Sequence, residues 1–212
     1  KELNDSGIDP LLIKSLIDYG SFCEDDLVQE YLAGLLTTSR IGLNNDNRAY
    51  SYSKLLETLS VYQIRSHYII YTIFHKLFLD MNINLGIMEN RAKLQTFIPF
   101  SQFLPFVLFT NEEKLIANSI IDHSLYGLIR NSLIEVSLIK GSKEHIAQTA
   151  YGKPLVEDGI VIQPSMLGIE LFLSINSIGK DIQVNYFTRS DLEFVDLIDC
   201  SKLDITKCFI YP

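Results

Sequence analysis

Up to about residue 130, hydrophobic positions recur every three or four residues, which is the spacing of one face of an α-helix. The segment EDDLVQEYLAGLLTTS, residues 24–39, shows this pattern clearly. Its apolar stripe consists of Leu27, Val28, Tyr31, Leu32, Leu35 and Leu36. Ala33 and Gly34 lie beside the stripe, where small side chains permit close contact with another helix. We therefore predict a mainly α-helical (α+β) protein in which residues 1–110 form a helical bundle.

Helix-start signals divide this bundle into separate helices. Asp9 and Pro10 precede an apolar segment that stops at Gly20, the order of a capping residue, a first-turn proline and a terminating glycine. Capping boxes, in which Ser or Thr is followed three residues later by Glu or Gln, predict three further starts. They are Ser21 with Glu24, Ser60 with Gln63, and Thr110 with Glu113.

The pattern changes after Ser124, where helix and strand signals alternate. A short helix is expected over residues 124–134, leading into a strand-like run, IEVSLIKG. A second strand-like run, GIVIQP, is followed by a helix that starts at Ser165. Helix, strand, polar loop and strand is the order of a winged-helix unit, which we place at residues 111–180.

The C-terminal residues 181–212 are predicted to form a tail that packs on the core. Within the tail, QVNYF and KCFIY are strand-like, and Ser190 with Glu193 signals one more helix start. The apolar segment 94–109 contains two prolines, so we interpret it as a buried connector, with a hydrophobic docking surface as the alternative. The whole chain as one compact domain is an alternative to this three-part division.

The stretch RSHYIIYTIFHK, residues 65–76, places two histidines in an apolar run. On a helix, one narrow arc that is expected to face water holds Arg65, Thr72 and Lys76. His67 falls almost opposite that arc, and His75 falls on its flank. The two histidines are about 12 Å apart along the axis, whereas zinc ligands bind at about 2 Å. We therefore predict a core helix with His67 as a neutral buried imidazole, and no metal site.

Composition describes a packed globular chain of 212 residues, of which 47% are hydrophobic and 21% are charged. The net charge of −8 argues against nucleic-acid binding over the whole surface. Cys23, Cys200 and Cys208 form no CxxC pair, which favours a reducing compartment and a cytoplasmic protein. We expect no membrane span and no cofactor. The opening KELNDSGIDP lacks both an initiator Met and a signal-peptide core, which is typical of a fragment or a processed form.

Sequence motifs for catalysis are lacking. The chain contains no GxSxG elbow, phosphate-binding glycine loop or HExxH pair. The carboxylate pairs at residues 25–26 and 112–113 lie in predicted first turns, where capping and the helix dipole explain them. Cys23 is near a predicted helix start, which favours a thiolate, but the acidic residues after it oppose that effect. We therefore assign no catalytic residue.

The predicted winged-helix unit supplies the first set of candidate binding residues. They are Arg130, Asn131, Lys140, Lys143 and Lys153, for nucleic acid or for a partner protein. Four basic and two acidic residues give the segment 124–154 a charge of +2, which leaves −10 for the rest of the chain. Because this asymmetry is weak, we favour protein docking over DNA binding.

The loop after the second predicted helix supplies a second set of candidates. The sequence NNDNR, residues 44–48, concentrates hydrogen-bonding groups between two predicted helices. The simplest interpretation is a loop that caps helix ends. The functional alternative is a small recognition surface with Arg40 and Arg48, or a hydrolase site of Arg40, Asp46 and Arg48, with or without His75.

Two segments carry a family resemblance. EDDLVQEYLAGLLTTSR combines an acidic turn with a helix that ends in a Leu-Leu-Thr-Thr-Ser run, and SYSKLLETLSVYQIRSHYIIYTIF has Leu-Ser before a long helix. Together with SLYGLIRNSLI and GIVIQPSMLGIELFL, they resemble the abortive-infection alpha family of bacterial proteins over residues 20–178. The resemblance implies a bacterial cytosolic protein linked to phage defence, and it supplies no catalytic residue.

Three functional hypotheses follow. The leading one is a non-enzymatic, phage-defence-associated protein that acts through contacts with a protein partner or with a second copy of itself. The alternative is a nucleic-acid-binding winged-helix regulator, which the net charge disfavours. A cryptic hydrolase ranks third, because no catalytic motif accompanies the loop.

Overall fold

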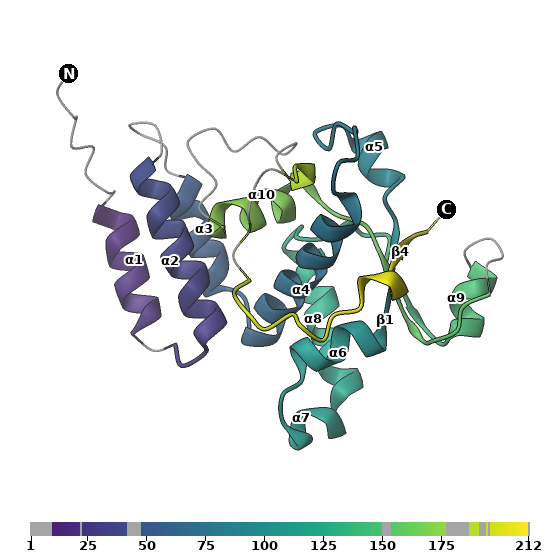
Figure 1. The fold of residues 1–212 in the computed structure, drawn as a ribbon. Coiled ribbons are helices and arrows are strands. Elements are labelled where there is room, and N and C mark those ends of the chain that lie inside the picture. The colour runs from purple at the N-terminus through teal and green to yellow at the C-terminus, as the bar shows by residue number, and fades with distance from the viewer. Residues whose placement is uncertain are drawn as a thin grey trace.

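The structure is a computed structural model that describes residues 10–21, 23–41, 48–149, 154–176, 187–190, 194 and 196–211. Helices dominate these residues and surround a small four-stranded antiparallel sheet (Figure 1). The prediction of a mainly helical α+β protein is therefore confirmed. Among the described residues, no helix combines the length and the hydrophobicity needed to cross a bilayer.

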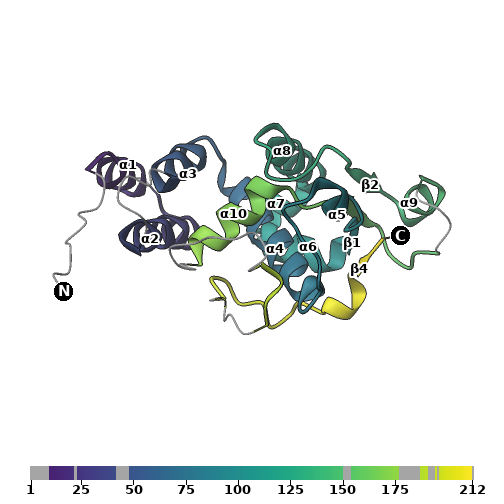
Figure 2. The ribbon, with the colours of Figure 1, turned by 90° about the horizontal axis from the view of Figure 1, so that it is seen from above.

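Three helices pack together at one end of the molecule: α1 (Pro10–Gly20), α2 (Asp26–Ile41) and α3 (Arg48–Glu57) (Figures 1 and 2). The predicted capping box of Ser21 and Glu24 is wrong. The Ser21 hydroxyl donates instead to the carbonyl of Asp18 at 3.2 Å. The cap of α2 is Asp25, whose carboxylate accepts from the N–H of Val28 at 3.3 Å, because Asp25 immediately precedes the first helical residue.

Helix α4 (Val61–Phe78) runs through the centre of the molecule and buries most of its side chains. The predicted capping box at its start is confirmed, with Ser60 and Gln63 each bonding the other's backbone N–H. The predicted core helix is confirmed as well. The short helix α5 (Met88–Ala92) follows, and its Arg91 donates to the carbonyl of Leu85 at 2.7 Å.

The sheet has the order β2-β3-β1-β4 and is antiparallel throughout. Its strands are β1 (Thr96–Pro99), β2 (Ile139–Gly141), β3 (Gly159–Ile162) and β4 (Phe209–Ile210). Side chains alternate across it, so that Ile98 and Ile160 face the main core while Phe97 and Val161 face a smaller cluster. The strand signal in KCFIY is confirmed by β4. Most of QVNYF, and the residues after Ser190 at the predicted helix start, lie outside the described residues.

The apolar segment 94–109 is largely buried as predicted, but it is not a simple connector. It contains β1 and then helix α6 (Phe100–Val107). Pro99 ends the strand and takes the N-cap position, where its fixed φ of −66° suits the turn into the helix. Pro105 lies inside α6 and has no N–H to donate to the carbonyl of Ser101, four residues earlier. Ser101 is exposed.

The helix expected after Thr110 is divided in two. The capping box of Thr110 and Glu113 is confirmed and starts α7 (Asn111–Leu115), and α8 (Ala117–Arg130) follows after a break at Ile116. The expected change of pattern at Ser124 is wrong, because α8 continues through it. The hydroxyl of Ser124 is buried and donates to the carbonyl of Ile120 at 2.7 Å, so a polar residue is satisfied inside the helix.

Helix α9 (Lys143–Thr149) lies between β2 and β3 in the chain, and α10 (Met166–Ile175) starts at Ser165, as predicted. Helix α10 packs against α2 at Gly34, one of the two small residues that the sequence suggested for close contact. A Cβ on Gly34 would lie only 2.0 Å from the carbonyl oxygen of Ile175. Thr38 strengthens this crossing by donating to the carbonyl of Ser174 at 2.6 Å.

Most buried apolar side chains form one continuous core. The predicted boundary between residues 110 and 111 runs through it, because β1 on one side pairs with β3 on the other. From the C-terminal tail, Phe187, Cys200 and Cys208 are buried in the same core. The division into three parts stays a prediction.

Candidate docking groove

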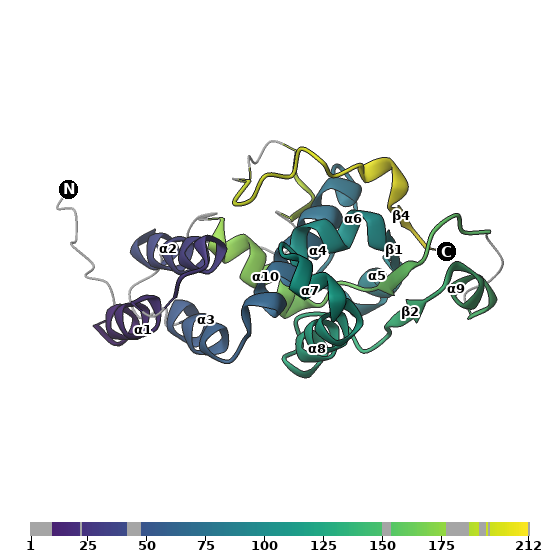
Figure 3. The same ribbon diagram turned by 90° about the horizontal axis from the view of Figure 1, so that it is seen from below.

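The basic residues predicted for binding do not form one free surface. Arg130 is exposed at the end of α8, where it lines a hollow of about 330 Å³ together with Asp122 and Tyr126. Lys140 on β2 forms an ion pair with Asp122, so its charge is neutralised (Figure 3 shows α8, β2 and α9).

Two further candidates from this set are described. Asn131 donates its side-chain amide to the carbonyl of Gly127 at 2.9 Å and so caps the end of α8. Lys143 is exposed and begins α9. Lys153 lies outside the described residues.

The second predicted site, the loop between α2 and α3, falls mostly outside the described residues. Arg40 belongs to α2, although its side chain is not described, and Asp46 is not described at all. Arg48 is exposed at the first position of α3. The hydrolase interpretation of this loop therefore stays a prediction.

The two histidines of α4 serve packing. His67 has no exposed surface; its Nε2–H donates to the carbonyl of Gly168 at 3.1 Å, and its Nδ1 accepts from the Tyr31 hydroxyl at 2.8 Å. Burial lowers the pKa of His67 to about 3, although the bond to Gly168 opposes that shift. The prediction of a neutral buried imidazole is confirmed.

His75 is also held by its surroundings. Its Nδ1–H donates to the carbonyl of Phe187 at 2.7 Å, and its ring packs 4.1 Å from the ring of Phe194, centroid to centroid. Burial lowers its pKa, and the bond to Phe187 opposes that shift. Among the described residues, no three His, Cys, Asp or Glu side chains are grouped to hold a metal ion.

Two cysteines are unsuited to nucleophilic chemistry. Burial raises the pKa of the Cys200 thiol to about 11 and that of the Cys208 thiol to about 12, with nearby carboxylates adding to both shifts. Both thiols are therefore protonated at neutral pH. Cys23 is half-buried and free.

The expectation that Arg65 and Thr72 face water is wrong, because other segments cover this side of α4. Thr72 is buried, and Arg65 binds the carboxylates of Asp25 at 2.7 Å and Glu113 at 3.5 Å. Arg65 also donates to the carbonyl of Val107 at 3.3 Å. One guanidinium thus ties the start of α2, the end of α6 and helix α7 to α4.

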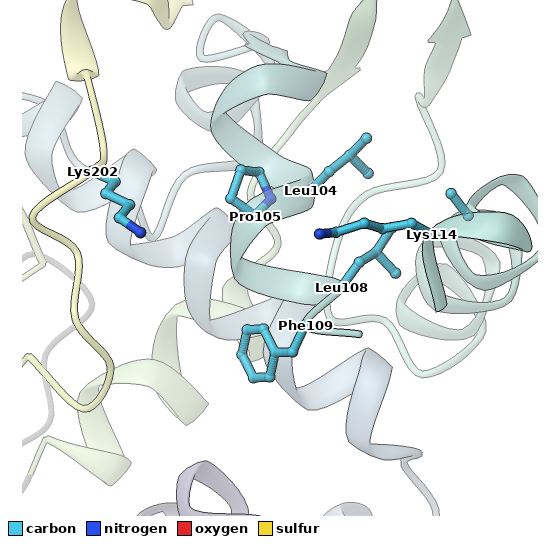
Figure 4. A pocket seen from close by; sticks show the side chains of 7 residues that line it. Leu104, Pro105, Leu108, Phe109, Lys114 and Lys202 are labelled. Carbon is cyan, nitrogen blue, oxygen red and sulfur yellow. The ribbon is translucent and has the colours of Figure 1, made fainter. Parts of the chain in front are cut away.

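Beside this ion-pair cluster, a groove of about 490 Å³ opens between α6, the α7–α8 junction and the C-terminal tail (Figure 4). Its apolar lining consists of Leu104, Pro105, Leu108, Phe109 and Ala117. The remaining lining residues are two lysines, Lys114 from α7 and Lys202 from the tail. In Figure 4 their side chains extend toward the groove from opposite sides.

Exposed apolar side chains adjoin the groove. Phe109 is 53% exposed, and its ring lies under the Arg65 guanidinium, 4.1 Å from ring centroid to the central carbon. Leu115 and Ile116 stand between two lining residues in the chain and are 86% and 58% exposed. Large apolar side chains gathered around a groove are typical of an interaction site.

The electrostatics of the groove differ from those of the chain as a whole. Lys114 and Lys202 are both exposed, and neither forms an ion pair with any described carboxylate. In contrast, Lys54 and Lys207 each pair with a nearby glutamate. Two unneutralised cations therefore border an apolar surface on a protein with a net charge of −8.

No family model, curated protein or solved structure matches this chain. The groove must therefore be interpreted from its own geometry.

The sequence pointed to the apolar part of the groove only through the alternative interpretation of residues 94–109 as a hydrophobic docking surface. It did not single out Leu115 and Ile116. In one continuous helix Ile116 would precede the buried Ile120 by four residues and share its face, but the break at Ile116 turns it outward. The sequence signal that could have pointed to these residues was the apolar pair Leu115-Ile116, which closely follows the acidic pair Glu112-Glu113.

Proposed function

We propose that this protein is a non-catalytic docking component whose groove between α6, α7 and the C-terminal tail binds a partner protein. The supporting observation is a groove lined by apolar side chains, including the exposed Phe109, whose lining residues Lys114 and Ala117 flank the exposed Leu115 and Ile116 in the chain. Exposed apolar patches of this kind on a soluble chain are favoured as contact sites, because covering them removes apolar surface from water. His67, His75 and the buried cysteines are engaged in packing, which agrees with a role without catalysis at these residues.

A capture experiment tests this function. The wild-type protein and the variant Leu115→Glu are used as baits in a bacterial lysate, and retained proteins are quantified. Val156→Glu is the matched control, because Val156 is 85% exposed and lies before β3, away from the groove-lining residues. We expect at least one protein that is retained by wild type and by the control and lost from Leu115→Glu. Identical retention by all three baits would refute the proposal.

The second part of the proposal is that the docking component contains a winged-helix-like unit. The support is topological. Helix α4, strand β1, helices α6 and α8, and strands β2 and β3 occur in this order, with the short helices α5, α7 and α9 between them, and β3 lies between β1 and β2 in the sheet. Such a unit starts at α4, which is earlier than the boundary at residue 111 predicted from sequence. In it, α8 takes the place of the recognition helix.

This topology also favours a second candidate function, binding of duplex DNA by α8. The exposed face of α8 weakens that candidate, because it presents Asp122 and Tyr126 before the single basic residue Arg130. Fluorescence anisotropy with duplex DNA at two salt concentrations decides between the two functions. Binding that weakens steeply with salt and is lost in Arg130→Glu would establish the DNA-binding function.

The biological setting that we propose is bacterial phage defence in the cytoplasm, which rests on the resemblance of residues 20–178 to the abortive-infection alpha family. The test is plaque formation on a bacterial host that carries the gene together with its chromosomal neighbours. We expect fewer plaques with the wild-type gene than with the Leu115→Glu variant. Equal plaque numbers with the wild-type gene and with the gene deleted would refute the association.

A further inference from the structure

We infer that the partner segment that fills the groove is an acidic amphipathic helix, with its apolar face on Leu104, Pro105 and Leu108 and its carboxylates between Lys114 and Lys202. This inference rests on the proposed docking function and specifies the chemistry of the partner. It commits to another protein, because two copies of a chain with a net charge of −8 repel each other as whole molecules.

The shape of the site favours a protein segment. A volume of about 490 Å³ falls within the range of roughly 300–1,000 Å³ that is typical of small-molecule pockets. A small molecule in the groove, however, would leave Leu115 and Ile116 in water. A helix laid along the groove covers apolar side chains inside and beside it, in the manner of other helix-in-groove complexes.

The charges of the site favour an acidic segment. The chain as a whole repels acidic partners, so a local excess of cations is needed to attract one. The carboxylate next to Lys114 in the chain, Glu113, is already bonded to other groups. Glu113 accepts from the backbone of Thr110 and Phe109 and pairs with Arg65.

Three other carboxylates lie near the lysines in sequence. Asp199 accepts from the backbone N–H of Ser201 at 2.9 Å, and its pKa is lowered mainly by its hydrogen bonds with Ser201 and less by the charge of Lys202. Asp204 accepts from the backbone N–H of Thr206 at 3.2 Å, and Glu112 is exposed in the first turn of α7, where the helix dipole stabilises it. None of the three forms an ion pair with a groove lysine. The lysines are therefore available to carboxylates of a partner.

The probe for this inference is a labelled amphipathic peptide of about 15 residues, the length at which an isolated helix begins to form. One version carries Leu and Phe on one face and Glu beside them; a second version has Lys in place of every Glu. Anisotropy is measured with the wild-type protein, with the double variant Lys114→Glu/Lys202→Glu, and with Lys14→Glu/Lys93→Glu as the charge-matched control. All four lysines are exposed, so the fold is expected to persist, and thermal unfolding checks this.

We expect the Glu peptide to bind wild type and the control equally, and to bind the double variant at least about tenfold more weakly, because repulsion replaces attraction at two positions. We expect the Lys peptide to prefer the double variant. Equal affinity of the Glu peptide for wild type and double variant, or binding of dodecanoate in place of the peptide, would overturn the inference.

The results that would refute the proposed docking function differ from those that would refute the inference about an acidic helix. If lysate proteins still depend on Leu115 but not on the two lysines, the groove docks a partner of different chemistry, and only the inference is lost. If no protein depends on Leu115, the docking function itself is lost.

Discussion

Protonation of His67 should make the stability of this protein depend on pH in a way that one substitution removes. The pKa of this imidazole is about 3 in the folded state, against 6.5 in the unfolded chain. The unfolded state therefore binds the proton first. The contribution of the neutral ring to stability is complete above pH 6.5 and is lost progressively as the pH falls from 6.5 toward 3.

The magnitude follows from the linkage of proton binding to folding. Each pH unit below 6.5 costs about 1.4 kcal/mol of the free energy of unfolding, so the loss at about pH 5.5 is about 1.4 kcal/mol. A lower pH is unsuitable, because the sequence pI of about 5.0 promotes association near that value. Other groups titrate in the same range, so the difference between two variants is needed to isolate His67.

The variant His67→Gln isolates this contribution. Its amide can donate to Gly168 and accept from Tyr31, and it does not titrate. Urea unfolding is measured for wild type and variant at about pH 8 and about pH 5.5. We expect the variant to be less stable by about 1–2 kcal/mol at the higher pH, and this deficit to shrink by about 1.4 kcal/mol at the lower pH.

The control is His145→Gln, which replaces an exposed imidazole on α9 by the same amide. A deficit of His67→Gln that does not change between the two pH values would refute the reasoning. That result would mean that the imidazole is protonated inside the core or is reached by water.

Three further predictions concern packing and reactivity. Arg65→Met should lower the free energy of unfolding by about 3 kcal/mol in urea titrations, because two largely buried carboxylates lose their cation. Gly34→Ala should lower the melting temperature and cost about 1–3 kcal/mol, because the new Cβ meets the backbone of Ile175. Thiol titration of the native protein should label Cys23 before Cys208, which is buried and has a raised pKa.

Matched controls make these predictions specific. Lys54→Met removes an exposed ion pair and should change stability by less than about 1 kcal/mol. Ala33→Gly, one residue from Gly34 on the exposed side of α2, should cost about 1 kcal/mol through helix propensity alone. A loss of stability in Arg65→Met no larger than in Lys54→Met, or faster labelling of Cys208 than of Cys23, would contradict the structural account.

Features that depend on a few neighbouring residues could be predicted from the sequence. The capping boxes at Ser60 and Thr110 form as predicted, because each joins a side chain to a backbone N–H three residues away, and the helix predicted from Ser165 begins directly after that residue. The burial of His67 follows equally from helical phase, since its position opposite Lys76 depends only on the turn per residue. Local bonds and periodicity were sufficient for these features.

The ion-pair cluster and the groove could not be predicted from the sequence, because both depend on how distant segments pack. Arg65 lies on the polar side of its own helix, yet segments 40 residues before it and 48 residues after it supply the carboxylates that bind it. The groove likewise needs the break at Ile116 and a lysine from the C-terminal tail. Contacts between segments far apart in the chain depend on how whole elements pack, and the periodicity of one segment holds no information about which other segment will cover it.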